Sequence, residues 1–253
     1  STFREDRSLP VAPSAIKLNG DYIHTPAGKH PYETPRALET HEVPLVVEDY
    51  RRAAQRAKGA GFDGVEIHGA NGYLIDQFLR SSTNQRSDAY GGSKENRARL
   101  LLEIIEAVTA AIGNDRVGLR LSPVTPFNDI ADADAQATFD YVVGELNRFD
   151  LAFLDILQGT GGSPQDQWLP FDYARLRAIY KGSLILNNGY DFASAQQAIA
   201  SGAADAIAFG RALLANPDLV ERFRRGAPLN QPDYERLYVG EEKGYTDYPF
   251  LPA

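Results

Sequence analysis

The sequence of 253 residues contains no cysteine, no methionine and a single tryptophan. Without cysteine the chain has no disulfide, no Cys-ligated zinc, no iron–sulfur cluster and no thiol nucleophile. No stretch approaches the roughly 20 consecutive apolar residues that a membrane-spanning helix needs. We therefore expect no membrane partner, and the lack of cysteine favours a reducing compartment, the cytoplasm.

Positive charge is also scarce. The chain has 26 Lys and Arg against 34 Asp and Glu, a formal net charge of −8. This balance argues against a nucleic-acid partner, although it allows a local basic site for phosphate. No group of His, Asp and Glu has the spacing of metal ligands, so no metal site is predicted. With 43% hydrophobic and 24% charged residues, the composition is that of a folded globular protein.

The chain divides into three stretches that we assign to a single domain. Residues 1–43 have many prolines and no clear period, and we expect an irregular excursion with a short hairpin around 16–24. Residues 44–229 alternate between short apolar runs and amphipathic segments. Residues 230–253 are rich in Tyr and Pro, and we interpret them as a C-terminal tail folded over the active site.

The alternation in the middle stretch predicts repeated βα units. Helices are expected from Pro44 to Gly59 and after Ser93, then over 133–147, 171–180, 193–200 and 211–225, the last broken by Pro217. Strands are expected over 62–67, 116–121, 151–157, 183–187 and 204–209. About five near-continuous apolar strands separated by helices indicate an α/β fold with a parallel sheet. In such folds functional groups collect where the strands end.

One strand end carries His68, Asn71 and Tyr73 within six residues. An imidazole and an amide can together donate hydrogen bonds to a developing oxyanion, and a nearby phenol can deliver a proton. The alternative is a capped strand end with a buried, hydrogen-bonded histidine. The residues by themselves leave both interpretations open.

Three further features allow two interpretations each. Arg120 lies inside an apolar strand, where it either forms an internal ion pair or faces a delocalised anion. Asn188-Gly189-Tyr190 and Gly210-Arg211 follow the last two strands. Glycine there either lets backbone N–H groups approach a phosphate or is an ordinary strand end. The glycines of residues 159–163 lack the Walker A pattern, and we expect a lid loop rather than a phosphate cradle.

Several long motifs resemble the Old Yellow Enzyme family of flavin-dependent ene-reductases. The longest are residues 61–79 (GFDGVEIHGANGYLIDQFL) and 84–97 (NQRSDAYGGSKENR). Residues 117–123, 209–211, 215–219 and 244–249 match in the same order, as do 11–14 and 34–38. The resemblance implies a (β/α)8 barrel of the TIM type that binds FMN and is reduced by NAD(P)H. The implied activity is that of an NADPH dehydrogenase type of ene-reductase, acting on small activated alkenes such as α,β-unsaturated carbonyls and nitroalkenes.

The resemblance also implies roles for individual residues. His68 and Asn71 are expected to hold the carbonyl or nitro oxygen of the substrate, and Tyr73 to protonate its α-carbon. Arg120 is expected beside the flavin, where it would stabilise the reduced anion. Tyr238 matches a tyrosine that closes the substrate pocket, although the residues around it depart from the family pattern. The phosphate of FMN is expected at Asn188, Gly189, Tyr190, Gly210 and Arg211.

The motif match and the strand count agree that the chain supplies about five βα units, strands 4–8 of the barrel. Five strands cannot close a barrel. We therefore expect a complementary chain carrying the first three βα units, joined through an obligate, core-like interface. A non-catalytic barrel fragment that binds a partner chain or a phosphate ligand is the alternative. An aldolase-type barrel is disfavoured, since neither a Schiff-base lysine nor metal ligands stand at the strand ends.

Overall fold

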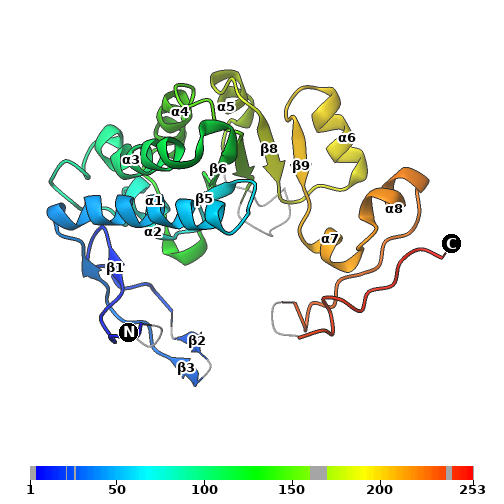
Figure 1. Cartoon of the computed structure of the whole chain (residues 1–253), viewed down its shortest axis with the longest axis horizontal. Coiled ribbons are helices and arrows are strands. Elements are labelled where there is room, and N and C mark those ends of the chain that lie inside the picture. The colour runs from blue at the N-terminus through cyan, green and yellow to red at the C-terminus, as the bar shows by residue number, and fades with distance from the viewer. Residues whose placement is uncertain (1–3, 21, 26, 160–169, 238–240, 253) are drawn as a thin grey trace.

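The computed structural model describes residues 4–20, 22–25, 27–159, 170–237 and 241–252. Its main sheet has five parallel strands in the order β5-β6-β7-β8-β9, which is also their order along the chain (Figure 1). This confirms the predicted α/β class and the parallel sheet of about five strands. The strands are β5 (Val65–Gly69), β6 (Val117–Leu121), β7 (Phe153–Leu157), β8 (Leu184–Asn187) and β9 (Ala206–Ala208).

The helices begin and end close to the predicted signals. Ser93 caps α3, because its side chain accepts a hydrogen bond from the backbone of Asn96, and Gly113 ends the helix with φ +100°. Asp191 caps α6 in the same way through Ser194. The helices are α1 (Val43–Gly59), α2 (Leu74–Leu79), α3 (Lys94–Ile112), α4 (Ala135–Leu146), α5 (Tyr173–Ile179), α6 (Phe192–Ala200), α7 (Arg211–Ala215) and α8 (Leu219–Arg225). Three 3-10 turns are η1 (Thr40–Glu42), η2 (Asn114–Arg116) and η3 (Phe127–Asp129).

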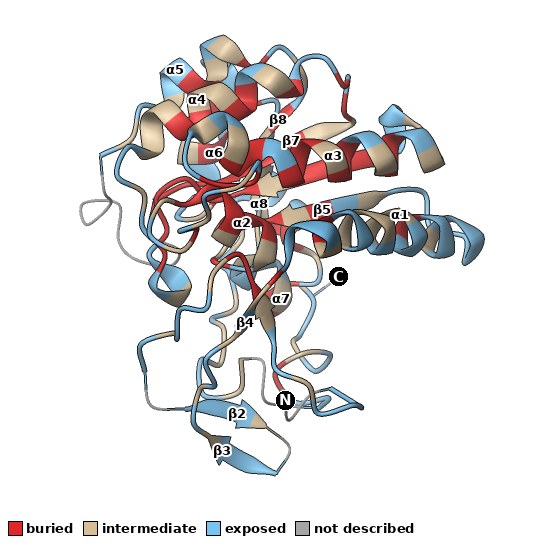
Figure 2. Ribbon diagram, turned by 90° about the vertical axis from the view of Figure 1, so that its left-hand side faces the viewer, coloured by how far each residue is buried: buried red, intermediate tan, exposed pale blue. Residues whose placement is uncertain are grey.

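The two faces of the sheet differ in chemistry. Alternate strand residues point to opposite faces, and one set packs under the helices to form the buried core (Figure 2). These helix-facing side chains are at most 3% exposed: Ile67, Leu119, Leu121, Leu154, Ile156, Leu184 and Leu186. The opposite set contains polar and charged residues, namely Glu66, His68, Arg120, Asp155 and Asn187. The inner face of the sheet, opposite the helices, therefore carries these polar and charged side chains together with apolar ones such as Phe153, Leu157 and Ile185.

The N-terminal stretch contains two small sheets. Strand β1 (Val11–Ala12) pairs in parallel with β4 (Arg36–Ala37), and β2 (Ile23–Thr25) pairs with β3 (Gly28–His30) in a hairpin. The hairpin predicted around 16–24 is thus placed too early. Its turn is set by Gly28, which has φ +106°, and by the Thr25 hydroxyl, which donates to the carbonyl of Gly28 at 2.8 Å. The hairpin projects away from the helices (Figure 1).

Two other local predictions need correction. His68, expected just beyond a strand, lies within β5 and pairs in register with Arg120 of β6. The six-residue α2 was not predicted, because so short a helix spans less than two turns and shows no amphipathic period. Over the described ranges, no helix combines the length and the apolar character that crossing a bilayer requires.

Candidate functional site

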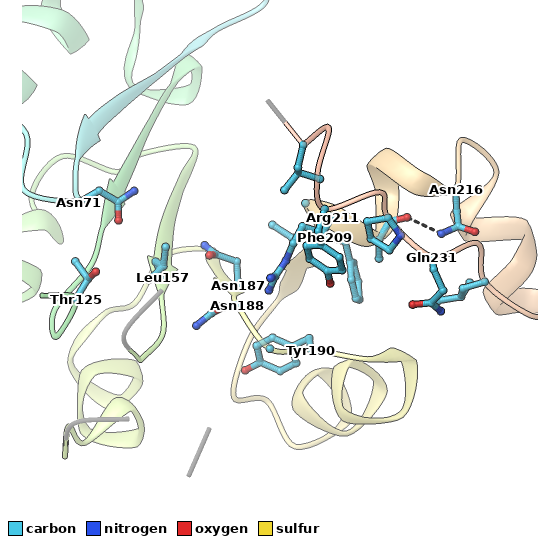
Figure 3. A pocket seen from close by; sticks show the side chains of 18 of the residues that line it. Asn71, Thr125, Leu157, Asn187, Asn188, Tyr190, Phe209, Arg211, Asn216 and Gln231 are labelled. Carbon is cyan, nitrogen blue, oxygen red and sulfur yellow. Dashed lines mark hydrogen bonds between the residues drawn. The ribbon is translucent and has the colours of Figure 1, made fainter. Parts of the chain in front are cut away.

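A cavity of about 760 Å³ lies at the carboxyl ends of β6 to β9. Asn71 and Thr125 stand on one side of it and Phe209 and Arg211 on the other, with Asn187, Asn188 and Tyr190 between them (Figure 3). The start of the C-terminal tail completes the wall through residues 229–232, Tyr234 and Leu237. The volume of the cavity falls within the range of cofactor and ligand pockets.

The loop after β8 is shaped by two successive residues with positive φ. Asn188 has φ +80° and Gly189 has φ +75°, which turns the backbone sharply at the cavity. The side chain of Asn188 donates to the carbonyl of Gln158 at 2.7 Å, and the Tyr190 hydroxyl donates to Gln158 Oε1 at 2.6 Å. Two contacts from the end of β7 therefore hold this loop in place.

The loop after β9 contributes Gly210 and Arg211, and both line the cavity. No atom would lie within 4 Å of a Cβ built on Gly210, so the backbone there stands open to a ligand. All five residues predicted for phosphate binding thus line one cavity. A glycine-rich loop beside an arginine suits an anionic ligand.

Arg120 reaches the same cavity from the inner face of β6. Its Nη2 donates to Asn187 Oδ1 at 3.1 Å, and its Nε lies 3.7 Å from Asp155 Oδ2. The amide of Asn187 in turn donates to Asp155. The structure thus confirms the internal ion pair, and Arg120 also lines the cavity. That it faces a delocalised anion stays a prediction.

The loop from β5 to α2 brings His68, Asn71 and Tyr73 together. The rings of His68 and Tyr73 have centroids 5.5 Å apart, and Asn71 lines the cavity. His68 and Tyr73 lie beside the cavity rather than in its lining, and Tyr73 is 53% exposed. Burial, followed by the charge of Arg120, lowers the pKa of His68 against the opposing effect of Asp76. The imidazole is therefore neutral at pH 7 and keeps one N–H for donation.

The conformation of this loop depends on contacts across to β6. Asn71 has φ +57°, and its backbone N–H donates to Ser122 Oγ at 2.8 Å. Asn128 donates to the Asn71 carbonyl at 2.8 Å. A Cβ on Gly72 would lie 2.5 Å from the carbonyl oxygen of Phe127, so the loop fits closely against residues 126–129.

A buried ion pair between Asp76 and Arg80 also contacts this loop. Asp76 is fully buried, accepts from the backbone N–H of Gly72 at 3.0 Å and from Ser122 Oγ at 3.3 Å, and pairs with Arg80 Nε at 2.7 Å. Arg80 also donates to the carbonyls of Ser122 and Pro123. The pair thus connects the loop carrying Asn71 to the end of the strand carrying Arg120.

The supporting residues Asp76, Asp155 and Asn187 were not predicted from the sequence, nor was the contact of Ser122, which directly follows β6. Signals for two of them exist, because Asp76 stands four residues before Arg80 and Asp155 faces inward by strand alternation. Tyr238 and most of the predicted lid loop at 159–163 lie outside the described residues.

Comparison with known proteins places the chain in a family. A model of the NADH:flavin oxidoreductase / NADH oxidase family matches residues 4–230. A probable flavin mononucleotide-dependent alkene reductase of Leishmania infantum is 48% identical over 251 residues, which cover 95% of this chain and 66% of that protein.

Solved structures agree. A structure of morphinone reductase in complex with tetrahydroNAD is 48% identical with a TM-score of 0.89, covering 98% of this chain and 68% of that one. An Old Yellow Enzyme homologue from Zymomonas mobilis is 46% identical with a TM-score of 0.91, covering 96% of this chain and 69% of that one. This chain spans about two thirds of the length of these relatives. It belongs to the NADH:flavin oxidoreductase / NADH oxidase family, and its likeness to Old Yellow Enzymes confirms the resemblance found in its motifs.

Proposed function

We propose that the protein is an FMN-dependent oxidoreductase that reduces activated C=C bonds with NAD(P)H. One observation carries the proposal: a single cavity joins Arg120 and the loops after β8 and β9 to the loop that bears Asn71. The relatives support it, since they include a probable flavin mononucleotide-dependent alkene reductase and a morphinone reductase in complex with tetrahydroNAD.

The residues of the cavity fit FMN. Arg120 and Arg211 bring two positive charges to the same cavity, and the open backbone at Gly210 leaves room for a phosphate beside Arg211. Asn188, Gly189, Tyr190, Gly210 and Arg211 would hold the phosphate, and Arg120 would face the flavin ring. When bound, FMN would supply the hydride that it receives from the reduced nicotinamide.

The remaining steps belong to side chains of this chain. His68 and Asn71 would donate hydrogen bonds to the carbonyl or nitro oxygen, which polarises the alkene and stabilises the charge that develops on that oxygen. Tyr73, next to His68, would give its phenolic proton to the α-carbon. Tyr238 would close the substrate pocket.

The proposal extends to the rest of the barrel. In the described sheet, β5 and β9 each have one neighbouring strand, so the expected first three βα units would pair with both edges. The native mass of the flavin-loaded protein tests whether a second polypeptide carries these units. A mass equal to this chain plus FMN alone would argue against a second polypeptide. The cytoplasmic location stays a prediction.

Two measurements on the purified protein test the activity. Titration with FMN should quench flavin fluorescence and saturate at one FMN per chain. Anaerobic NAD(P)H should then bleach the flavin absorbance, and an α,β-unsaturated ketone should restore it. Two outcomes would support the non-catalytic alternative instead. In the first, FMN binds but enones do not reoxidise the reduced flavin; in the second, inorganic phosphate binds but FMN does not.

Ser122→Ala is expected to weaken binding of the enone without affecting FMN. The hydroxyl accepts from the backbone of Asn71, so its loss frees the residue that holds the substrate oxygen. One lost hydrogen bond of about 1 kcal/mol corresponds to a KM raised roughly fivefold. Steady-state kinetics with an enone measure the KM, and FMN titration measures the cofactor Kd.

Ser81→Ala is the matched control. Ser81 Oγ accepts from the backbone of Ala133 at 2.8 Å and donates to Asp132, which is the same pattern at a site away from the cavity. Its KM should equal that of the unchanged protein. If the KM changes equally in the two variants, the effect of Ser122→Ala comes from a less stable fold and not from the lost contact with Asn71.

A further inference from the structure

The inner face of the sheet carries a basic residue between two acids on neighbouring strands. Glu66 lies on β5, Arg120 on β6 and Asp155 on β7, and Arg120 and Asp155 are partners in the β6–β7 register. The side chain of Asp155 is 6% exposed, whereas that of Arg120 is 31% exposed and reaches the cavity. Seen from the cavity, Asp155 thus lies buried behind Arg120.

Asn187 links the two charged groups. Its side-chain nitrogen donates to Asp155 Oδ1, which leaves its oxygen to accept from Arg120 Nη2 at 3.1 Å. Arg120 is therefore held at two points, by Asn187 at Nη2 and by the carboxylate of Asp155 3.7 Å from Nε. This arrangement restricts where the guanidinium can lie at the cavity.

We propose that Asp155 is the counter-charge of Arg120, positioning its guanidinium at the cavity and offsetting part of its positive charge there. The inference rests on the proposed function, in which the cavity holds FMN. Charges interact strongly in a site of low dielectric constant, so a carboxylate this close reduces the positive potential that Arg120 presents to a ligand.

The negative charge of Asp155 should also change the midpoint potential of the flavin. Burial is the largest influence on Asp155 and raises its pKa, while Arg120 and the Asn187 hydrogen bond oppose the shift. Well above that pKa the carboxylate is charged. Reduced FMN has more negative charge than oxidised FMN, so the potential of Arg120 favours the reduced form. Asp155 therefore holds the two-electron midpoint potential below the value that Arg120 alone would set.

Asp155→Asn tests this inference at pH 8, because alkaline pH favours the ionised carboxylate when burial raises its pKa. Asparagine keeps the shape and can still accept from Asn187, but it has no charge. The ratio of the Kd for oxidised FMN to the Kd for reduced FMN should rise about tenfold, equivalent to a midpoint potential about 30 mV more positive for a two-electron couple. Anaerobic titration against a reference dye of known potential measures the shift without any turnover.

Asp140→Asn is the control, because Asp140 also pairs with an arginine, Arg175 at 2.6 Å, but on α4 in the outer helical layer. Its midpoint potential should not change. An unchanged potential in Asp155→Asn, an equal shift in both variants, or a folded Asp155→Asn that no longer binds FMN would each overturn the inference. If Asp155→Asn does not fold, Asp155→Ser is measured in the same way.

The outcomes separate this inference from the proposed function. If the unchanged protein binds no FMN, the proposed function fails and the inference fails with it. If it binds FMN and transfers electrons to enones while Asp155→Asn shows no shift, only the role of Asp155 is wrong.

Discussion

Tyr73→Phe is expected to lower the rate of enone reduction by roughly 10² or more while leaving the reduction of FMN by NAD(P)H intact. A positioned general acid typically contributes a factor of about 10² to 10⁴ to a rate. The substitution removes one oxygen and keeps the ring that lies 5.5 Å from His68, so the packing of the loop should survive. Only the step that needs a proton at the α-carbon should slow.

Stopped-flow absorbance separates the two half-reactions. Flavin bleaching by NAD(P)H should keep its rate in Tyr73→Phe, whereas reoxidation by an enone should become slow. Tyr141→Phe, on α4 in the outer helical layer, is the control and should change neither rate. Undiminished reoxidation in Tyr73→Phe would remove Tyr73 from the role of proton donor, and equal losses in both half-reactions would point to a binding role.

Most of the architecture could be predicted from the sequence because its signals are local. Five apolar runs gave the five parallel strands, and Ser93 and Asp191 marked helix starts where their side chains do accept the capping hydrogen bonds. The errors have local causes too. The six residues of α2 are too few to show a period, and the hairpin predicted around 16–24 lies instead at 23–30, where Gly28 takes a positive φ.

The candidate site was predicted only in part, because the side chains that position its residues lie far from them in the sequence. Asn71 and Arg211 could be found by their places after strands, and both line the cavity. The contacts that position the site residues could not, because Ser122 contacts Asn71 from 51 residues away and Asn187 contacts Arg120 from 67 residues away. Such contacts depend on how strands pair, which no local pattern encodes.

Arg80→Met is expected to cost about 3–5 kcal/mol of folding free energy, the range for breaking a buried ion pair by removing one partner. The side chain of Arg80 is 2% exposed, and that of Asp76 is fully buried. Methionine keeps the apolar stem, but it leaves the carboxylate of Asp76 without a counter-charge. The carbonyls of Ser122 and Pro123 lose their donors, and the guanidinium stacked 4.5 Å above the ring of Phe139 is also lost.

Urea denaturation followed by circular dichroism measures the loss, with Arg52→Met as the control. Arg52 pairs with Asp49 at 3.6 Å on the surface of α1, where both side chains are at least 50% exposed, and an exposed pair contributes little. Removing the stranded charge with Asp76→Asn in the Arg80→Met background should recover part of the stability, because an asparagine needs no counter-charge. If the double variant is no more stable than Arg80→Met, the cost lies in the unpaired carbonyls and lost packing rather than in the buried charge of Asp76.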